Sequence, residues 1–223
     1  GLCTARELQT RGRQVMVIER GNFGGQCSTG NAGLVVPSHI MPLAAPGVVG
    51  QGLRWLMRRD SPFRIKPRLD LTLMRWLWSF YTSCTERHVE HAIPLLRDLN
   101  LESRALYADW AEQATGTGLG FRSSGLLMHK TEKGRTKDLK DAEYAQKAGL
   151  DIRVLDAGEV HDHTFHLPPS VQGGVYYAQD GLVDPTRVID ALTHELGEQG
   201  ATLRPEVAVT GFDHSHGSIQ RIQ

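Results

Sequence analysis

The sequence lacks an excess of charge, a long hydrophobic run and a set of paired cysteines. Its 223 residues carry 25 Lys and Arg against 25 Asp and Glu, so it does not have the basic balance of a dedicated nucleic-acid-binding domain. No apolar run approaches the roughly 20 residues of a membrane-spanning helix. The three cysteines, Cys3, Cys27 and Cys84, are too far apart for a CxxC metal motif or a disulfide framework. This cysteine usage favours a reducing compartment, and we expect the cytoplasm.

What remains is the composition of a folded globular protein. Hydrophobic residues make up 40% of the chain and charged residues 22%. The length suggests one or two domains. The chain begins with Gly1 and not with Met, and it ends at Gln223 inside a predicted strand. We therefore expect an internal piece of a longer protein, incomplete at both ends.

Hydrophobic periodicity predicts a chain of mixed helices and strands. Helices are predicted at residues 1–11, 53–59, 70–84, 131–148 and 185–199. Residues 85–113 form either one long helix or two helices that meet near Pro94. Strands are predicted at residues 14–19, 121–130, 151–155 and 174–178, the last followed by a turn at 179–181. A hairpin of residues 207–212 and 218–223 closes the chain.

The first residues have the pattern of the second half of a dinucleotide-binding βαβ unit. Gly1 precedes the first predicted helix, Gly12 ends it, and the β-branched strand that follows ends in Glu19. In such a unit the last glycine of GxGxxG allows close packing of helix on strand, and the acid accepts hydrogen bonds from the adenosine ribose. An acid favours FAD or NAD over NADP. Any other αβ unit whose strand ends in glutamate would show the same pattern.

A glycine-rich loop at residues 21–33 follows Glu19 and carries small hydrogen-bonding side chains. Ser28, Thr29 and Asn31 lie there among glycines. Backbone N–H groups and hydroxyls of such a loop can bind a pyrophosphate and the edge of a flavin. Together with the αβ unit, the loop favours a cofactor site over a plain surface loop.

Five stretches of the sequence resemble the bacterial FAD-dependent D-amino-acid dehydrogenases, within the glycine/D-amino-acid oxidase superfamily. They are residues 1–21 (GLCTARELQTRGRQVMVIERG), 27–48 (CSTGNAGLVVPSHIMPLAAPGV), 60–80 (DSPFRIKPRLDLTLMRWLWSF), 123–130 (SSGLLMHK) and 173–185 (GGVYYAQDGLVDP). The Asn-Ala-Gly turn followed by Ala-Pro-Gly is specific to this branch, whereas the αβ unit alone is not. The resemblance covers nearly the whole chain.

The resemblance implies FAD as the cofactor and assigns residues to it. Glu19 would bind the adenosine ribose, and Val207 would touch the adenine through its backbone. Ser28 and its neighbours would contact the pyrophosphate or the ribityl chain, and Asn31 and its neighbours would lie near the isoalloxazine. The full set of cofactor-binding residues is Gly1, Glu19, Arg20, Cys27, Ser28, Thr29, Asn31, Ala32, Gly33 and Val207.

The reaction that the resemblance implies is oxidation of the CH–NH2 group of a D-amino acid by hydride transfer to the flavin. The products are a 2-oxo acid and ammonia, and a membrane quinone is an expected electron acceptor. Because the flavin carries the chemistry, no side chain is assigned as a catalytic acid or base, and the substrate-binding arginine is expected outside these residues. Glycine, sarcosine or a cyclic imino acid such as hydroxyproline are alternative substrates. A binding fragment without redox chemistry is the alternative of a different class.

The expected fold class is α/β, with two domains. Residues 1–50 and 183–223 would form part of a Rossmann-like FAD-binding domain. Residues 51–182 would form a helical connection and an α+β substrate domain with a mainly antiparallel sheet.

The histidine-rich stretch HDHTFH at residues 161–166 has the spacing of a possible zinc site. It lies before Pro168 and Pro169 in a predicted loop, with no fourth ligand in the pattern. We therefore expect a solvated loop and no metal.

Aromatic and basic residues are interleaved between residues 54 and 81, as in helices that lie on a membrane surface. The same aromatics can form the core under helices that pack on a domain. We expect core, with peripheral binding to the inner face of the membrane as the alternative. The residues are Arg54, Trp55, Arg58, Arg59, Arg75, Trp76, Trp78, Phe80 and Tyr81.

Overall fold

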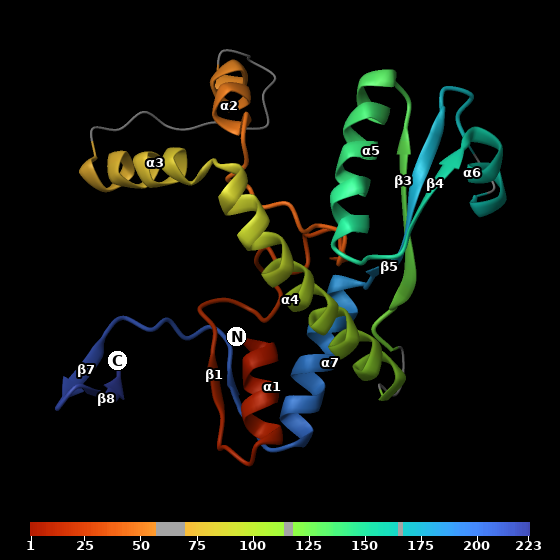
Figure 1. Cartoon of the computed structure of the whole chain (residues 1–223). Helices are drawn as coiled ribbons and strands as arrows, with labels where there is room; N and C mark the ends of the chain where they lie inside the picture. The colour runs from red at the N-terminus through yellow and green to blue at the C-terminus, as the bar shows by residue number, and fades with distance from the viewer. Residues whose placement is uncertain (57–69, 114–117, 165–166) are drawn as a thin grey trace. The chain divides into compact units, whose positions relative to one another are not determined.

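The computed structural model describes residues 1–56, 70–113, 118–164 and 167–223, in two compact units (Figure 1). The first unit comprises Gly1–Val35, Leu106–Arg122 and Gly181–Gln223, and the second comprises Val36–Ala105 and Ser123–Asp180. Helix α4 (Glu86–Gln113) and strand β5 (Gly173–Leu182) contribute residues to both. These limits differ from the predicted domain boundaries at residues 50 and 183. The division into a cofactor domain and a substrate domain stays a prediction.

The first unit contains the predicted αβ element. Helix α1 (Leu2–Thr10) begins after Gly1 and leads into strand β1 (Met16–Ile18). Helix α7 (Pro185–Glu198) has Asp184 as its N-cap, and the Asp184 carboxylate accepts hydrogen bonds from two backbone N–H groups of the first turn. The strand β6 (Thr202–Arg204) pairs with β1 in parallel. The sequence did not predict β6, because three residues are too few to show an alternating pattern.

A buried cluster joins the helices of the first unit. Trp110 and Leu119 pack against Val188 and Leu192 of α7, with Leu2 of α1 at the margin. The apolar face of α7 is therefore covered by residues that are distant in sequence. Its burial explains why a helix of mixed composition is stable at this position.

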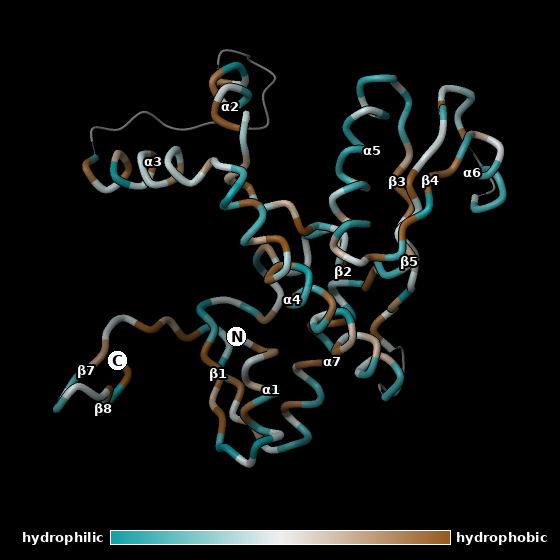
Figure 2. Tube along the Cα trace, in the orientation of Figure 1, coloured by the Kyte–Doolittle hydropathy of each residue, from teal (hydrophilic) through white to brown (hydrophobic). Residues whose placement is uncertain are grey.

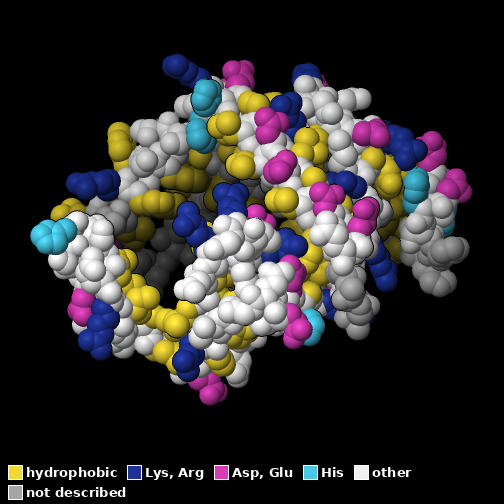
Figure 3. All heavy atoms as spheres, turned by 90° about the horizontal axis from the view of Figure 1, so that it is seen from below, with side chains coloured by type: hydrophobic (Ala, Val, Ile, Leu, Met, Phe, Trp, Pro, Cys, Tyr) yellow, Lys and Arg dark blue, Asp and Glu magenta, His cyan; other side chains and the backbone are white. Residues whose placement is uncertain are grey.

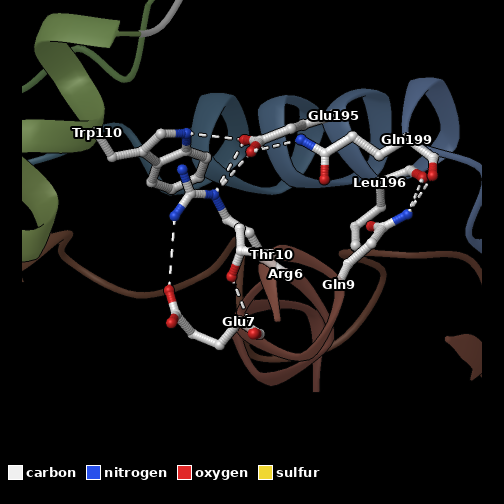
Figure 4. A network of polar contacts seen from close by, with 8 residues as sticks. All are labelled: Arg6, Glu7, Gln9, Thr10, Trp110, Glu195, Leu196 and Gln199. Atoms are coloured by element: carbon white, nitrogen blue, oxygen red, sulfur yellow. Dashed lines mark hydrogen bonds and ion pairs between the residues drawn. The ribbon is translucent and has the colours of Figure 1, made fainter. Parts of the chain in front are cut away.

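The carboxylate of Glu195 holds three helical segments of this unit together (Figure 4). It accepts hydrogen bonds from the Arg6 Nε, at 2.9 and 3.1 Å, and from the Trp110 Nε1, at 3.0 Å. The Arg6 guanidinium also lies over the Trp110 ring, 5.1 Å from its centroid. Gln9 of α1 donates to the carbonyl of Gln199 at 2.6 Å. The charge-assisted bonds from Arg6 to Glu195, together with the Gln9 bond, hold α1 and α7 side by side.

Replacing Glu195 with alanine is expected to lower the free energy of unfolding by about 2 kcal/mol, because the Trp110 N–H and the Arg6 guanidinium lose a half-buried acceptor. Urea unfolding of the full-length protein measures the loss. Glu198 lies exposed on the same helix, and its replacement with alanine should change stability by less than about 0.5 kcal/mol. Equal losses for the two variants would show that the network contributes nothing specific.

The second unit contains an antiparallel sheet and most of the helices. Strand β4 (Ile152–Asp156) pairs with β5 in antiparallel register, and β3 (Arg122–His129) also neighbours β5. Helix α5 (Glu132–Lys147) covers this sheet through Ala142 and Ala145, which pack with Ile40, Val175 and Tyr177. Strand β2 (Leu34–Val35) pairs with Leu182 and Gly181, the part of β5 that belongs to the first unit. The expected antiparallel sheet is confirmed.

Several predicted elements have different limits in the structure. The predicted turn at residues 179–181 is wrong, since β5 continues to Leu182 through pairing with β2. The first hairpin strand begins later than predicted, and the pair is β7 (Phe212–Ser215) with β8 (Ser218–Ile222). Helix α2 (Val48–Leu56) begins earlier than residue 53, and the rest of that predicted helix lies outside the described residues. The long helix is continuous, with Pro94 inside it.

The first three residues of the histidine-rich stretch, His161 to His163, belong to a helix and not to a loop. Helix α6 (Ala157–His163) begins with a capping box, in which Asp156 and Glu159 satisfy each other's backbone N–H groups. This signal was present in the sequence as Asp-Ala-Gly-Glu. Residues 165–166 lie outside the described part of the chain. Among the described residues, no group of three or more His, Cys, Asp or Glu side chains could hold a metal ion.

The aromatic residues of α2 and of α3 (Leu71–Ser83) do not form core, so this expectation is wrong. Neither helix contains a buried residue. Trp76, Trp78 and Tyr81 are 55%, 67% and 57% exposed, and hydrophobic positions alternate with neutral and hydrophilic ones along both helices (Figure 2). Arg58 and Arg59 lie outside the described residues. No helix in the described part of the chain is long and apolar enough to cross a membrane.

Candidate cofactor site

The end of β1 brings Glu19 next to Val207, although they are distant in sequence. The Glu19 N–H donates to the Arg204 carbonyl, and the Val207 N–H donates to the Glu19 carbonyl, each at 3.0 Å. The Gly21 N–H donates to the Glu19 carboxylate at 3.0 Å, which orients that carboxylate. Glu206, at φ 60°, donates its N–H to the Gly21 carbonyl. The two residues assigned to the adenosine half of a cofactor thus lie together at the end of a parallel strand pair.

The loop after Glu19 is shaped by its own side chains. The Thr29 hydroxyl donates to the Gly24 carbonyl at 2.7 Å. A Cβ atom on Gly24 would lie 3.0 Å from the Ile189 side chain of α7, so the loop packs closely against that helix. The Thr29 hydroxyl proton is therefore used in a hydrogen bond within the loop, whereas the neighbouring Cys27 and Ser28 are exposed.

Asn31 makes a tight turn that leads into Gly33. Its side-chain amide donates to the Ser28 carbonyl and its side-chain oxygen accepts from the Gly33 N–H at 2.7 Å. Both polar atoms of Asn31 thus shape the turn, a role that the sequence did not predict. Ala32, at the tip of the turn, is exposed.

Gly33 lies against the chain that enters α7. Its φ is 65°, and a Cβ atom there would lie 2.0 Å from the Val183 carbonyl oxygen. The Val183 N–H donates to the Gly33 carbonyl at 2.8 Å. Only glycine fits this backbone conformation and this approach. Val183 was missed as part of the site, and its only signal in the sequence was its place before the Asp-Pro cap of α7.

The remaining assigned residues lie at the margins of this arrangement. Gly1 is exposed at the start of α1, where its carbonyl accepts the first helical hydrogen bond from Ala5. Arg20 is exposed beside Glu19. On the face of the molecule seen in Figure 3, Lys and Arg side chains are interspersed with Asp and Glu. The structure places the Glu19 carboxylate, the Gly21 N–H and the Val207 backbone close together, with Arg20 at the start of the loop.

These features fit the adenosine and pyrophosphate of a dinucleotide. A half-buried carboxylate at the end of a parallel strand suits a ribose. The loop at residues 21–33 folds on its own hydrogen bonds and leaves the exposed Ser28 and its backbone neighbours for phosphate oxygens. The close approaches at Gly24 and Gly33 hold this loop on α7.

Comparisons with known proteins agree on one family. The family model described as DAO, FAD dependent oxidoreductase, matches residues 1–223. A D-amino acid dehydrogenase 2 from Ralstonia nicotianae is 32% identical over 177 residues, which are 78% of this chain and 40% of the relative. A D-amino acid dehydrogenase from Rhizobium rhizogenes is 29% identical over 90% of this chain and 49% of its own length. The chain thus spans about half the length of the curated relatives it matches.

A solved structure has the same fold. Glycine oxidase from Bacillus cereus superposes with a TM-score of 0.68 over 99% of this chain and 47% of that chain, at 19% identity. At this identity the likeness concerns the fold alone. It agrees with the expected combination of a parallel αβ element and an antiparallel sheet.

Proposed function

Because the chain belongs to the DAO family of FAD dependent oxidoreductases, we propose that the whole protein oxidises D-amino acids to 2-oxo acids and ammonia. The arrangement of Glu19, the loop at residues 21–33 and Val207 supports FAD as the cofactor. The substrate class is supported by the name that the curated relatives share, D-amino acid dehydrogenase.

The site residues have distinct proposed roles toward FAD. Glu19 accepts hydrogen bonds from the adenosine ribose, with Arg20 beside it, and the backbone of Val207 borders the adenine. Cys27, Ser28 and Thr29 border the pyrophosphate or the ribityl chain. Because the Thr29 and Asn31 side chains are used within the loop, the contacts here come from the Ser28 hydroxyl and from backbone N–H groups.

Asn31, Ala32 and Gly33 border the isoalloxazine, and Gly33 holds them there by packing against Val183. Bound FAD supplies the acceptor for the hydride that leaves the substrate α-carbon. The protein's own task is to orient the amino acid, to keep its amine neutral and to hold the flavin rigidly. Water then converts the imino acid to the 2-oxo acid and ammonia.

A substrate screen of the full-length protein tests this proposal. An artificial electron acceptor would be reduced in the presence of D-amino acids and not of their L-enantiomers. Preferential turnover of glycine, sarcosine or hydroxyproline would keep the cofactor and replace the substrate class. A protein that takes up no FAD would contradict the proposal and favour the alternative of a binding module without redox chemistry.

We further propose that the electron acceptor is a membrane quinone and that α2 and α3 bind the membrane surface. Neither Val48–Leu56 nor Leu71–Ser83 contains an acidic residue, whereas Arg54 and Arg75 lie within them. Exposed Trp and Tyr side chains favour the interface between lipid headgroups and acyl chains, and the arginines favour anionic lipids. Trp76 stacks on Phe80, at 5.4 Å between ring centroids, and Trp78 lies beside Tyr81, at 5.9 Å, so the aromatic side chains of α3 form two pairs, neither of them buried.

Replacing both Trp76 and Trp78 with serine is expected to reduce binding of the full-length protein to vesicles that contain anionic lipid by at least about tenfold, since two exposed indoles would no longer enter the interface. Sedimentation with phosphatidylglycerol vesicles measures the binding. The matched control replaces Leu95 and Leu99, which are exposed on α4, with serine. Unchanged binding of the Trp variant, or an equal loss in the control, would contradict the proposal.

A further inference from the structure

Asp180 is a buried carboxylate that no part of the proposed cofactor chemistry uses. It is 5% exposed and lies near the end of β5. One carboxylate oxygen accepts from the Ser38 N–H at 3.0 Å, and the other accepts from the Ser38 hydroxyl at 2.7 Å. Both donors belong to a single residue, so the carboxylate fixes the backbone and the side chain of Ser38 at once.

The neighbouring strand makes room for this carboxylate. A Cβ atom on Gly125 of β3 would lie 2.4 Å from the Asp180 Cβ and 3.0 Å from its Oδ2. Any side chain at position 125 would therefore displace Asp180 from Ser38. The absence of a side chain at Gly125 therefore lets the Asp180 side chain take the position from which it reaches Ser38.

The Asp180 carboxylate is held by neutral donors. Burial raises its pKa, and the two bonds from Ser38 and the charge of nearby His39 lower it only in part. Tyr177 has its pKa raised to about 12, chiefly by burial, with smaller effects of Asp141, Asp138 and Asp180. Ionisation of Asp180 therefore carries an electrostatic cost in the folded protein.

Ser38 lies on the segment that directly follows the proposed flavin loop. Gly33 at its start is held by Val183, and Val35 pairs with Gly181. Ile40 at its end is 1% exposed in the core beside α5. Between them, the Asp180 carboxylate is the side-chain anchor that the structure shows for Ser38.

We propose that Asp180 is a positioning residue for the flavin: by fixing Ser38, it sets the course of the segment that runs from the Asn31 turn into the core. The inference rests on the proposed function, because it assumes that this turn borders the isoalloxazine. The chemical requirement is an acceptor at position 180 for the Ser38 N–H. An amide oxygen meets that requirement, whereas a methyl group does not.

Two substitutions in the full-length protein separate positioning from stability. Asp180→Ala is expected to weaken FAD binding by at least tenfold and to change the visible circular dichroism of the bound flavin. Asp180→Asn is expected to keep both close to the wild type. Its thermal stability at pH 7 should equal or exceed that of the wild type, because a group whose folded pKa is raised destabilises the fold once ionised.

Leu155→Ala provides the matched control, since Leu155 lies in another buried cluster of the same unit, with Val160 and Val171. It is expected to lower the melting temperature and to leave the flavin dichroism unchanged. Ser38→Ala keeps the backbone donor and should shift the dichroism in the same direction as Asp180→Ala, by a smaller amount. If Asp180→Ala does not fold, the dichroism of Ser38→Ala tests the inference instead.

Three results would overturn the inference. They are wild-type flavin dichroism in the Asp180→Ala variant, the same dichroism change in Leu155→Ala, or, if only Ser38→Ala folds, wild-type dichroism in that variant. A wild-type protein that binds no FAD would instead refute the proposed function, so the two failures are distinguishable.

Discussion

Replacing Gly33 with alanine is expected to remove FAD from the full-length protein. The new Cβ atom would lie 2.0 Å from the Val183 carbonyl oxygen, so the backbone of one of the two segments must move. The φ of 65° adds roughly 1 to 2 kcal/mol for a residue with a side chain. Because the displaced segment carries Asn31 and Ala32, we expect the FAD dissociation constant to rise at least about a hundredfold, or about 2.7 kcal/mol. The flavin-to-protein ratio after gel filtration measures this loss.

Gly12 provides a control that separates backbone strain from the collision. It has a φ of 72°, and no heavy atom would lie within 4 Å of a Cβ atom there. Alanine at this position should cost roughly 1 to 2 kcal/mol of stability and leave the flavin in place. If Gly12→Ala loses FAD as completely as Gly33→Ala, or if Gly33→Ala retains it, the close approach to Val183 does not position the cofactor.

The opening αβ element could be read from the sequence because its signals are local. Gly12 has the positive φ of a helix stop, and the β-branched run became β1. The same holds for α7, whose Asp184 and Pro185 act as cap and first residue. Each of these signals lies within a few residues of the element it predicts, so no tertiary contact had to be known.

The parts that the sequence could not predict depend on contacts between distant residues. Asp180 and Gly181 have turn propensity, yet pairing with β2 and the bonds to Ser38 keep β5 extended through them. The sequence predicts Asn31 and Thr29 as ligand donors because it shows polar side chains, but it does not show that the loop itself uses them. The sequence likewise predicts core at the aromatic residues of α3, because an apolar pattern does not show what, if anything, packs against it.

Replacing Glu19 with glutamine should weaken FAD binding by about tenfold, or about 1.4 kcal/mol, while alanine should weaken it by about a hundredfold. Glutamine keeps one oxygen acceptor for the Gly21 N–H, so the loop remains in place and only the charged acceptor for the ribose is lost. Alanine removes that anchor as well, and the loop that borders the pyrophosphate then loses its first fixed point. Titration of the apoprotein with FAD, followed by flavin fluorescence, measures both constants.

The order of the two variants is the decisive part of this prediction. If Glu19 binds the ribose through its carboxylate, the glutamine variant must lie between the wild type and the alanine variant. If Glu19 only anchors Gly21, glutamine must equal the wild type, because the anchoring oxygen is preserved. Glu198→Gln removes a charge from the exposed end of α7 and should leave the affinity unchanged, which excludes an effect of net charge alone. A carboxylate at position 19 also repels a 2′-phosphate, so NADP should not bind to the wild type or to Glu198→Gln, which both keep Glu19. Tight NADP binding by the wild type would refute the assignment of Glu19 to the ribose.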